Sequence, residues 1–230
     1  MTEVWAALPV KEFAGAKQRL SPLLGPEQRQ VLAATMVEDV LAALAGAQLA
    51  GIMVNTLDPT ATVLAQRYGA RVVREGARDG HTGAVVAMGR ILAAEGRAML
   101  TMPGDIPRVT AVEVDAVLAA MAPPPSFTIV PAHDELGSNA VLCAPPNVVP
   151  LRFGDNSYFP HLAAARQCGV EPTVIRAPGI ALDIDNPQDL VAFLRAEPPM
   201  ETRTRKLLES WGLAGFPAVH PGHLERPRPS

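Results

Sequence analysis

The first regular element of the chain is Val4-Trp5-Ala6-Ala7-Leu8-Pro9-Val10, which continues directly into Lys11-Glu12-Phe13-Ala14-Gly15-Ala16-Lys17-Gln18-Arg19-Leu20. The first run is short and apolar and has a proline near its end, which indicates a buried parallel strand over 4–10. The second run carries the cations Lys11, Lys17 and Arg19 around Gly15. Apolar residues at helical spacing follow from Glu27 to Ala45, so the pattern predicts a strand, a cationic loop and a helix.

The cationic loop is a candidate anion-binding site. Gly15 has no Cβ, so backbone N–H groups beside it can approach an anion closely. A strand that enters a helix through such a loop commonly holds the phosphates of a nucleotide. The spacing Gly-x-Lys-x-Arg matches neither the Walker pattern nor the dinucleotide pattern Gly-x-Gly-x-x-Gly. A solvated, charged turn is therefore the alternative interpretation of the loop taken alone.

Strand and helix patterns alternate over the following hundred residues. The expected elements are strands at 51–56, 70–74, 97–102 and 127–131, and helices at 27–45, 59–68, 80–94 and 110–121. This alternation predicts an α/β fold with a mostly parallel sheet, right-handed crossovers and helices on both faces. Ligands of such sheets bind at the carboxyl ends of the strands.

The alternation ends after Pro131. The loop 133–137 has no room for a crossover helix, so we expect the strand 138–144 to be antiparallel and the sheet to be mixed. A helix at 159–168, a strand at 172–176, a turn at 179–185 and a helix at 188–194 follow. We expect one nucleotide-binding domain over 1–197. A C-terminal extension over 198–230 would hold an amphipathic helix at 202–211 and a Pro/Arg-rich tail.

Composition excludes several classes of partner. The chain has 230 residues, a formal net charge of −3 and a pI near 6.0, so it has no bulk attraction for nucleic acid or an anionic membrane. No apolar run reaches the roughly 18 residues that span a bilayer, and no secretory leader pattern is visible. We therefore expect a cytoplasmic protein with small-molecule substrates. Cys143 and Cys168 lack metal-ligand spacing and lie in apolar segments, which predicts buried, reduced thiols. The oligomeric state stays open, a homodimer included.

Three features are expected at the carboxyl ends of predicted strands: the cationic loop, Asp105, and the segment with Asp183 and Asp185. Asp105 lies in Pro103-Gly104-Asp105-Ile106-Pro107, and Asp183 and Asp185 lie in Leu182-Asp183-Ile184-Asp185. Each has a structural alternative, because Asp105 suits a turn and Asp185 suits the N-cap of the next helix. Together with a basic loop, carboxylates from separate segments suit Mg²⁺ bound through one or two carboxylates and substrate phosphates.

A second polar cluster lies on loops beyond the middle of the expected sheet. Ser138, Gly154, Asn156 and Ser157 are small, and Arg152 is close to them in the sequence. Such a set suits the phosphate or carboxylate of a second substrate. The alternative is ordinary loop chemistry, with Ser157 capping a helix. Two histidines, His81 and His133, are expected near the cleft, whereas His161 is assigned to a helix.

With these motifs in place, the chain resembles the 2-phospho-L-lactate guanylyltransferase family, the CofC/FbiD-type enzymes of coenzyme F420 assembly among the MobA-like nucleotidyltransferases. The resemblance runs from about Val4 to Leu194. It is carried by 9–20, 103–107, 137–140, 153–157 and 182–190. It implies a single Rossmann-like nucleotidyltransferase domain. It also implies transfer of GMP from GTP to the phosphate of 2-phospho-L-lactate, phosphoenolpyruvate or 3-phospho-D-glycerate, with release of pyrophosphate.

The resemblance also assigns roles to residues. It implies that Lys17 contacts the triphosphate and that Asp105 binds Mg²⁺, which makes both catalytic, with Asp183 and Asp185 as further metal ligands. The remaining expected positions are Pro9, Lys11, Gly15, Arg19, Gly80, Thr82 and Pro103 for the nucleotide and Ser138, Gly154 and Ser157 for the acceptor. Thr82 stands where the family usually has Asn, which keeps two alternatives open. One is a MobA-like enzyme that uses CTP or molybdopterin, and the other is a non-catalytic nucleotide-binding protein.

Overall fold

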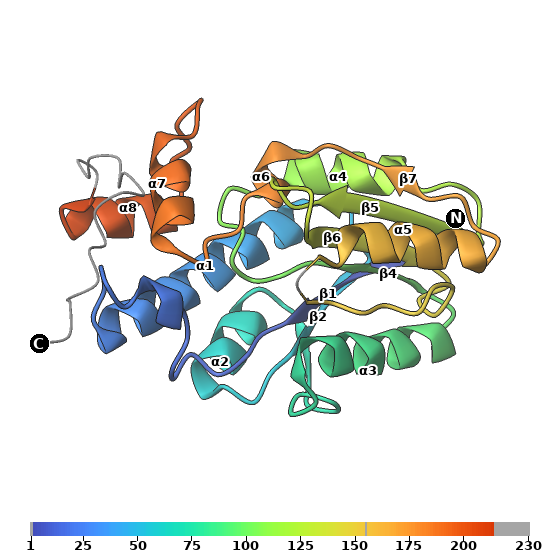
Figure 1. Cartoon of the computed structure of the whole chain (residues 1–230). Coiled ribbons are helices and arrows are strands. Elements are labelled where there is room, and N and C mark those ends of the chain that lie inside the picture. The colour runs from blue at the N-terminus through green and yellow to red at the C-terminus, as the bar shows by residue number, and fades with distance from the viewer. Residues whose placement is uncertain (1, 155, 214–230) are drawn as a thin grey trace, which may run out of the picture.

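Seven strands form one sheet in the order β3-β2-β1-β4-β6-β5-β7 (Figure 1). The computed structural model describes residues 2–154 and 156–213. The strands are β1 (Val4–Pro9), β2 (Gly51–Asn55), β3 (Arg71–Val73), β4 (Ala98–Thr101), β5 (Ser126–Pro131), β6 (Ser138–Ala144) and β7 (Thr173–Val174). All neighbours pair in parallel except β6, which runs antiparallel to both β4 and β5. The predicted mixed sheet and its antiparallel strand are confirmed.

Helices cover both faces of the sheet, as predicted. The helices are η1 (Gln18–Leu20), α1 (Pro26–Gly46), α2 (Pro59–Arg67), α3 (Gly80–Ala94), α4 (Ala111–Ala119), α5 (Tyr158–Gln167), α6 (Pro178–Ala181), α7 (Pro187–Arg195) and α8 (Arg203–Ser210). One apolar core joins α1, α2 and α4 to one face, and another joins α3 and α5 to the opposite face. Successive strand residues such as Leu8 and Ala7 enter opposite cores, because side chains alternate along a strand.

The helix starts follow local capping chemistry. Thr110 and Glu113 form the predicted capping box of α4. At α7 the cap is Asn186, whose side chain accepts from the backbone N–H groups of residues 188 and 189. Asp185 is therefore not the N-cap, and the structural alternative considered for it is wrong. Its carboxylate is available for another role.

Three expectations for the second half of the chain need correction. The expected turn at 179–185 contains the short helix α6, so the segment with Asp183 and Asp185 follows a helix and not the end of a strand. The strand β7 covers two residues only, because only Thr173 and Val174 pair with β5. Cys143 is buried as expected, but Cys168 is exposed, because it lies at the C-cap of α5 beyond the packed turns.

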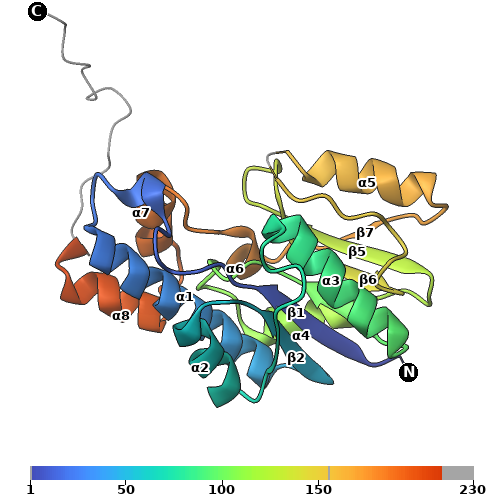
Figure 2. The ribbon, with the colours of Figure 1, turned by 90° about the horizontal axis from the view of Figure 1, so that it is seen from below.

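A third apolar core lies beyond the sheet, where α7 and α8 pack against α1 (Figure 2). It contains Leu20 from η1, Leu208 from α8 and Ile184. Ile184 belongs to the segment 182–185, which is called the acidic segment below because it holds Asp183 and Asp185. Asp39 of α1 accepts from the backbone N–H groups of Arg203 and Thr204 and so holds the start of α8. The predicted C-terminal helix therefore supports both the cationic loop and the acidic segment. The Pro/Arg-rich tail lies outside the described residues.

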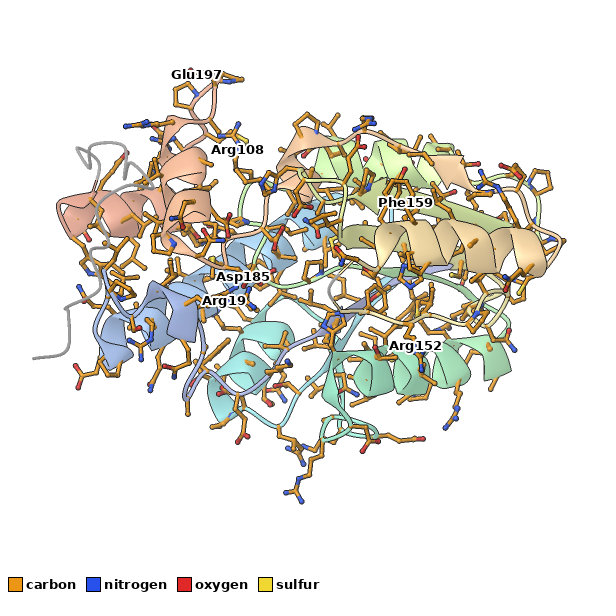
Figure 3. All side chains as sticks on the ribbon, viewed as in Figure 1. Arg19, Arg108, Arg152, Phe159, Asp185 and Glu197 are labelled. Atoms are coloured by element: carbon orange, nitrogen blue, oxygen red, sulfur yellow. The ribbon has the colours of Figure 1, made fainter. Side chains whose placement is uncertain are left out.

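Arg108 joins the last connection to this end of the molecule (Figure 3). Its guanidinium donates to the carbonyls of Ala196 and Pro198, on either side of Glu197. The connection between α7 and α8 is thereby fixed against the loop that follows β4. Among the described residues, no helix is both long enough and apolar enough to cross a membrane.

Candidate functional site

The cationic loop follows β1 and is anchored by a hydrogen bond to Asp58. Phe13 is buried, and its backbone N–H donates to Asp58 Oδ2 at 2.9 Å. The same carboxylate caps α2 by accepting from Ala61 N. Gly15 has φ 75° and Lys17 has φ 53°, and the left-handed conformation is unfavourable for a residue with a Cβ. Such strain is characteristic of residues held in place at functional sites.

Lys17 joins the loop to the two acidic segments. Its Nζ atom donates to Asp105 Oδ2 at 2.5 Å and to Asp185 Oδ1 at 2.7 Å. The Lys17 side chain is only 10% exposed, whereas that of Asp185 is 46% exposed. An ammonium has three N–H donors, so one remains for a phosphate oxygen while both ion pairs are kept. The predicted convergence of basic and acidic residues is present.

The charges of this cluster shift one another's proton affinities. Burial alone lowers the pKa of Lys17, but Asp105 and Asp185 outweigh it and raise that pKa above its ordinary value. Burial raises the pKa of Asp185, and the opposing attraction of Lys17 brings it below its ordinary value. No described cation pairs with Asp183 in this way, and burial and the charge of Asp105 raise its pKa. The cluster therefore holds more negative charge than Lys17 offsets.

Hydrogen bonds from a side-chain amide and from the backbone hold the acidic segment in place. Asn139 on β6 donates from Nδ2 to Asp183 Oδ1 at 2.9 Å and to the carbonyl of Ala181 at 3.0 Å. Asp189 Oδ2 accepts from the backbone N–H of Asp185. The backbone N–H of Ile184 donates to the Asp105 carbonyl at 3.0 Å. These bonds bring the loop after β4 and the segment after α6 together.

The donor set suits a divalent cation that is bound jointly with a phosphate ligand. Asp105 Oδ1 is buried and has no hydrogen-bond partner, and such an oxygen carries a large cost unless a ligand or water satisfies it. Asp183 is held beside it without a cationic partner in the described part of the chain. Within that part, no three His, Cys, Asp or Glu side chains form a complete metal cage. Mg²⁺ commonly takes only one or two carboxylates and obtains its other ligands from phosphates and water.

Two hollows meet at this cluster. The first has a volume of about 570 Å³, within the usual range for small-molecule sites. The cationic loop over 9–19 and part of α1, including Met36 and Val37, line it. Pro9, Lys11, Gly15, Lys17 and Arg19, all predicted to bind nucleotide, are therefore on its wall.

The second hollow has a volume of about 780 Å³ and lies on the side of β6 and α5. Its lining includes Ser138, Gly154 and Ser157, which were predicted to bind the acceptor, together with Asp183. The two hollows share the side chains of Lys11, Arg19, His81, Pro103, Asp105 and Asp185. Figure 3 labels two of these shared residues, Arg19 and Asp185. A group bound in one hollow thus lies beside a group bound in the other.

Two predicted nucleotide-binding residues, Gly80 and Thr82, line neither hollow. Thr82 Oγ1 instead accepts from Phe153 N at 3.0 Å and so fastens the start of α3 to the loop after β6. His81, between them, lines both hollows as expected. Burial and the nearby Lys11 lower the pKa of His81, despite the opposing charge of Asp105.

The polar residues of the second hollow are linked to one another. Ser157 occupies the N-cap position of α5 but makes no capping bond with its side chain, and its hydroxyl donates to Ser138 Oγ at 3.2 Å. Gly154 has φ 147°, in the region that favours glycine. Asn156 also lines this hollow, whereas Arg152 is exposed and lines neither hollow in the described part of the chain. The expected role of Arg152 beside an anion has no support in this geometry.

Sequence reasoning missed two polar residues of this site. Asn139 lies inside a quoted motif, yet a single Asn in a strand does not reveal that it faces a carboxylate 44 positions away. His161 was assigned only to a helix, but it is fully buried and bonded to Ser138. A polar residue on the apolar stripe of a helix was the available sign, since buried polar groups need partners.

Comparison with known proteins identifies the family to which the chain belongs. The family model described as "Guanylyl transferase CofC like" matches residues 4–221. A phosphoenolpyruvate guanylyltransferase of Rubrobacter xylanophilus is 35% identical over 203 residues, which cover 88% of this chain and 98% of the relative. A 3-phospho-D-glycerate guanylyltransferase of Colwellia psychrerythraea is 32% identical, with 88% and 97% covered.

A solved structure shares the fold. A nucleotidyl transferase from Methanothermobacter superposes with a TM-score of 0.58 at 18% identity, covering 83% of this chain and 94% of the other. The match of the family model over nearly the whole described chain, and the two relatives above 30% identity, decide the family. The chain belongs to the CofC-like guanylyl transferase family and is a nucleotidyltransferase.

Proposed function

We propose that this enzyme transfers GMP from GTP to the phosphate of a small phospho-carboxylic acid, with phosphoenolpyruvate as the first candidate acceptor. Relatives named for phosphoenolpyruvate support this choice. The 3-phospho-D-glycerate enzyme supports 3-phospho-D-glycerate as the second candidate. 2-Phospho-L-lactate presents the same carboxylate and phosphate and completes the set to be tested.

One observation carries the proposal more than any other. Lys17, on the wall of the first hollow, bridges Asp105 and Asp185, which line both hollows. A triphosphate in the first hollow would extend toward this wall, and an acceptor in the second would approach it from the other side. Two substrates held next to each other need little further ordering before they react.

In the proposed reaction, an oxygen of the acceptor phosphate attacks the α-phosphorus of GTP in line. A new oxygen–phosphorus bond forms, the bond between the α-phosphorus and the bridging oxygen breaks, and pyrophosphate leaves. The attacking phosphate already carries negative charge, so no protein nucleophile is required. Lys11, Lys17 and Arg19 would offset the charge that gathers on the triphosphate and on the leaving pyrophosphate. Catalysis therefore rests on positioning and on charge neutralisation.

Asp105 and Asp183, with Asp185 at their side, are the residues that would hold Mg²⁺. The unpartnered Asp105 Oδ1 and the excess negative charge around Lys17 support this assignment. When bound, the ion supplies positive charge next to the phosphate oxygens. Asn139 keeps Asp183 oriented through its hydrogen bond, which is the usual task of a residue behind a metal ligand.

The test is an end-point assay of purified protein. GTP, or CTP or ATP in parallel, is incubated with Mg²⁺ and each of the three phospho-acids in turn, and pyrophosphate release is compared with the mass of the nucleotide adduct. We expect equal amounts of pyrophosphate and adduct for one acceptor, loss of both with a chelator, and recovery with added Mg²⁺. Faster turnover of CTP or ATP than of GTP would contradict the base assignment. GTP binding without turnover of any acceptor would favour a non-catalytic role.

Gly80 and Thr82 remain predicted nucleotide contacts. A cytoplasmic location likewise remains a prediction, and the oligomeric state stays open.

A further inference from the structure

His161 of α5 is a buried histidine that the proposed chemistry does not use directly. Its residue exposure is 1%, and both of its ring nitrogens have partners. Nε2 accepts from the backbone N–H of Arg152 at 3.0 Å, and Nδ1 lies 2.9 Å from Ser138 Oγ. Phe153 packs edge to face against the ring with centroids 5.1 Å apart. The imidazole is therefore held in one position and one plane.

The partners determine where the proton of this ring resides. A backbone N–H can only donate, so Nε2 must offer its lone pair to Arg152. Burial lowers the pKa of His161 to about 4, and the neutral ring therefore carries its single proton on Nδ1. Nδ1–H then donates to Ser138 Oγ.

Ser138 Oγ consequently accepts two hydrogen bonds. One comes from His161 Nδ1–H and the other from the hydroxyl of Ser157 at 3.2 Å. A hydroxyl oxygen has two acceptor positions and one proton, so both acceptor positions are filled. Ser138 can then only donate its proton to a further partner, and it lines the second hollow.

We propose that His161 is a positioning residue that makes Ser138 an obligatory hydrogen-bond donor to an acceptor-only oxyanion in the second hollow. This inference rests on the proposed function, because it names the chemical class that the acceptor side of the site selects. A phosphate or carboxylate oxygen accepts the bond, whereas a ligand group that must donate has no place to do so. The site thereby discriminates by hydrogen-bond direction as well as by charge.

Two near-isosteric variants separate the two bonds of the ring. His161→Asn keeps an N–H donor near the position of Nδ1, and His161→Gln keeps an acceptor near that of Nε2 for Arg152. We expect His161→Gln to raise the KM for the phospho-acid about tenfold or more, the effect of losing one hydrogen bond to a charged group. His161→Asn should recover most of this loss, and the KM for GTP should change less than about twofold in both.

A double-mutant cycle with Ser138→Ala tests whether the effect passes through Ser138. If it does, His161→Gln in the Ser138→Ala background should raise the acceptor KM less than about twofold further. Equal increases in both backgrounds, or parallel increases in the KM values of GTP and phospho-acid, would overturn the assignment, because a general structural role predicts both.

The tautomer is measured without any variant. Nitrogen NMR of the full-length protein labelled in histidine should show Nδ1 of His161 protonated and Nε2 unprotonated throughout pH 6 to 8, and the opposite tautomer would overturn the inference. Absence of turnover by the wild type would contradict the proposed function instead, and the tautomer would still decide the role of His161. Turnover by the wild type with an unchanged acceptor KM in His161→Gln would contradict the inference alone.

Discussion

Lys17 and Asp185 are 168 positions apart in the chain, and Lys17 Nζ donates to Asp185 Oδ1 at 2.7 Å. The contact joins the loop after β1 to the segment before α7, and the same Nζ atom reaches Asp105 after β4. Three distant segments thus meet at one ammonium group. The properties of this cluster can be measured separately for catalysis, stability and packing.

Removal of the ammonium should abolish most of the activity. Lys17→Met keeps much of the side-chain volume but leaves Asp105 and Asp185 without their cation, and the triphosphate without one positive contact. We expect kcat to fall by about 10²–10³-fold, the usual effect of losing one charge-stabilising donor. Lys206→Met on α8 is the matched control, because Lys206 is exposed and its ion-pair partner Glu201 is exposed as well. Pyrophosphate release by both variants is the measurement, and equal effects would contradict the role of Lys17.

Asp183→Asn should separate stability from activity. Burial and Asp105 raise the pKa of Asp183, so the folded protein binds its proton more tightly than the unfolded chain. The resulting penalty is absent below the unfolded pKa, builds up as pH rises from the unfolded to the folded pKa, and is complete above the folded pKa. The variant keeps the oxygen that accepts from Asn139. It should therefore be more stable than the wild type at pH 7.

The same variant should lose at least about 10–100-fold in activity, since effects of this size follow even from loss of groups behind a metal ligand. Urea unfolding of the metal-free protein at pH 7 and pH 4 measures the first effect. The gain in stability should shrink at the lower pH. A less stable variant at pH 7 would contradict the electrostatic account.

Gly104 lies beside the proposed metal site and in tight contact with α1. A Cβ at Gly104 would be 2.8 Å from Val37 Cγ2, and Val37 is β-branched and has few alternative rotamers in a helix. Gly104→Ala should therefore cost about 1–3 kcal/mol of unfolding free energy. In the Val37→Ala background the same change should cost less by at least about 1 kcal/mol. Denaturant unfolding of the four proteins checks this coupling, and additive costs would contradict the contact.

The C-terminal helix should support the site through the third apolar core. Leu208 is fully buried there with Leu20 and Ile184, so Leu208→Ala should cost about 2–5 kcal/mol and raise the KM for GTP. Val112 on α4 is 77% exposed, and Val112→Ala should stay within about 0.5 kcal/mol of the wild type. Thermal unfolding and GTP kinetics of both variants test the difference. An unchanged KM for GTP in Leu208→Ala would contradict the proposed support of the site by α8.

Much of the fold could be predicted because its determinants are local. The capping box at Thr110, the proline after Asn186 and the short loop before Ser138 each specify one start or one direction of an element. The meeting of Lys17 with Asp105 followed from the rule that parallel strands end at one edge of the sheet. These inferences needed no knowledge of distant partners.

The remainder depends on partners far apart in the chain. Ser138 and His161 are 23 positions apart, and their bond arises only because α5 packs on the sheet. Thr82 was assigned to the nucleotide by its place in a motif, yet it bonds to Phe153 across 71 positions. Helix α6 was missed because four residues carry too little periodicity to be distinguished from a turn.

The most direct test of the central assignment is a crystal structure with Mg²⁺ and guanosine 5′-(α,β-methylene)triphosphate, in which the bond to be broken is replaced by a stable one. We predict the triphosphate along the loop over 9–19, with Lys17 Nζ within about 3.2 Å of a phosphate oxygen and the metal ion on Asp105. A triphosphate bound elsewhere, with Lys17 remote from every phosphate oxygen, would contradict the account.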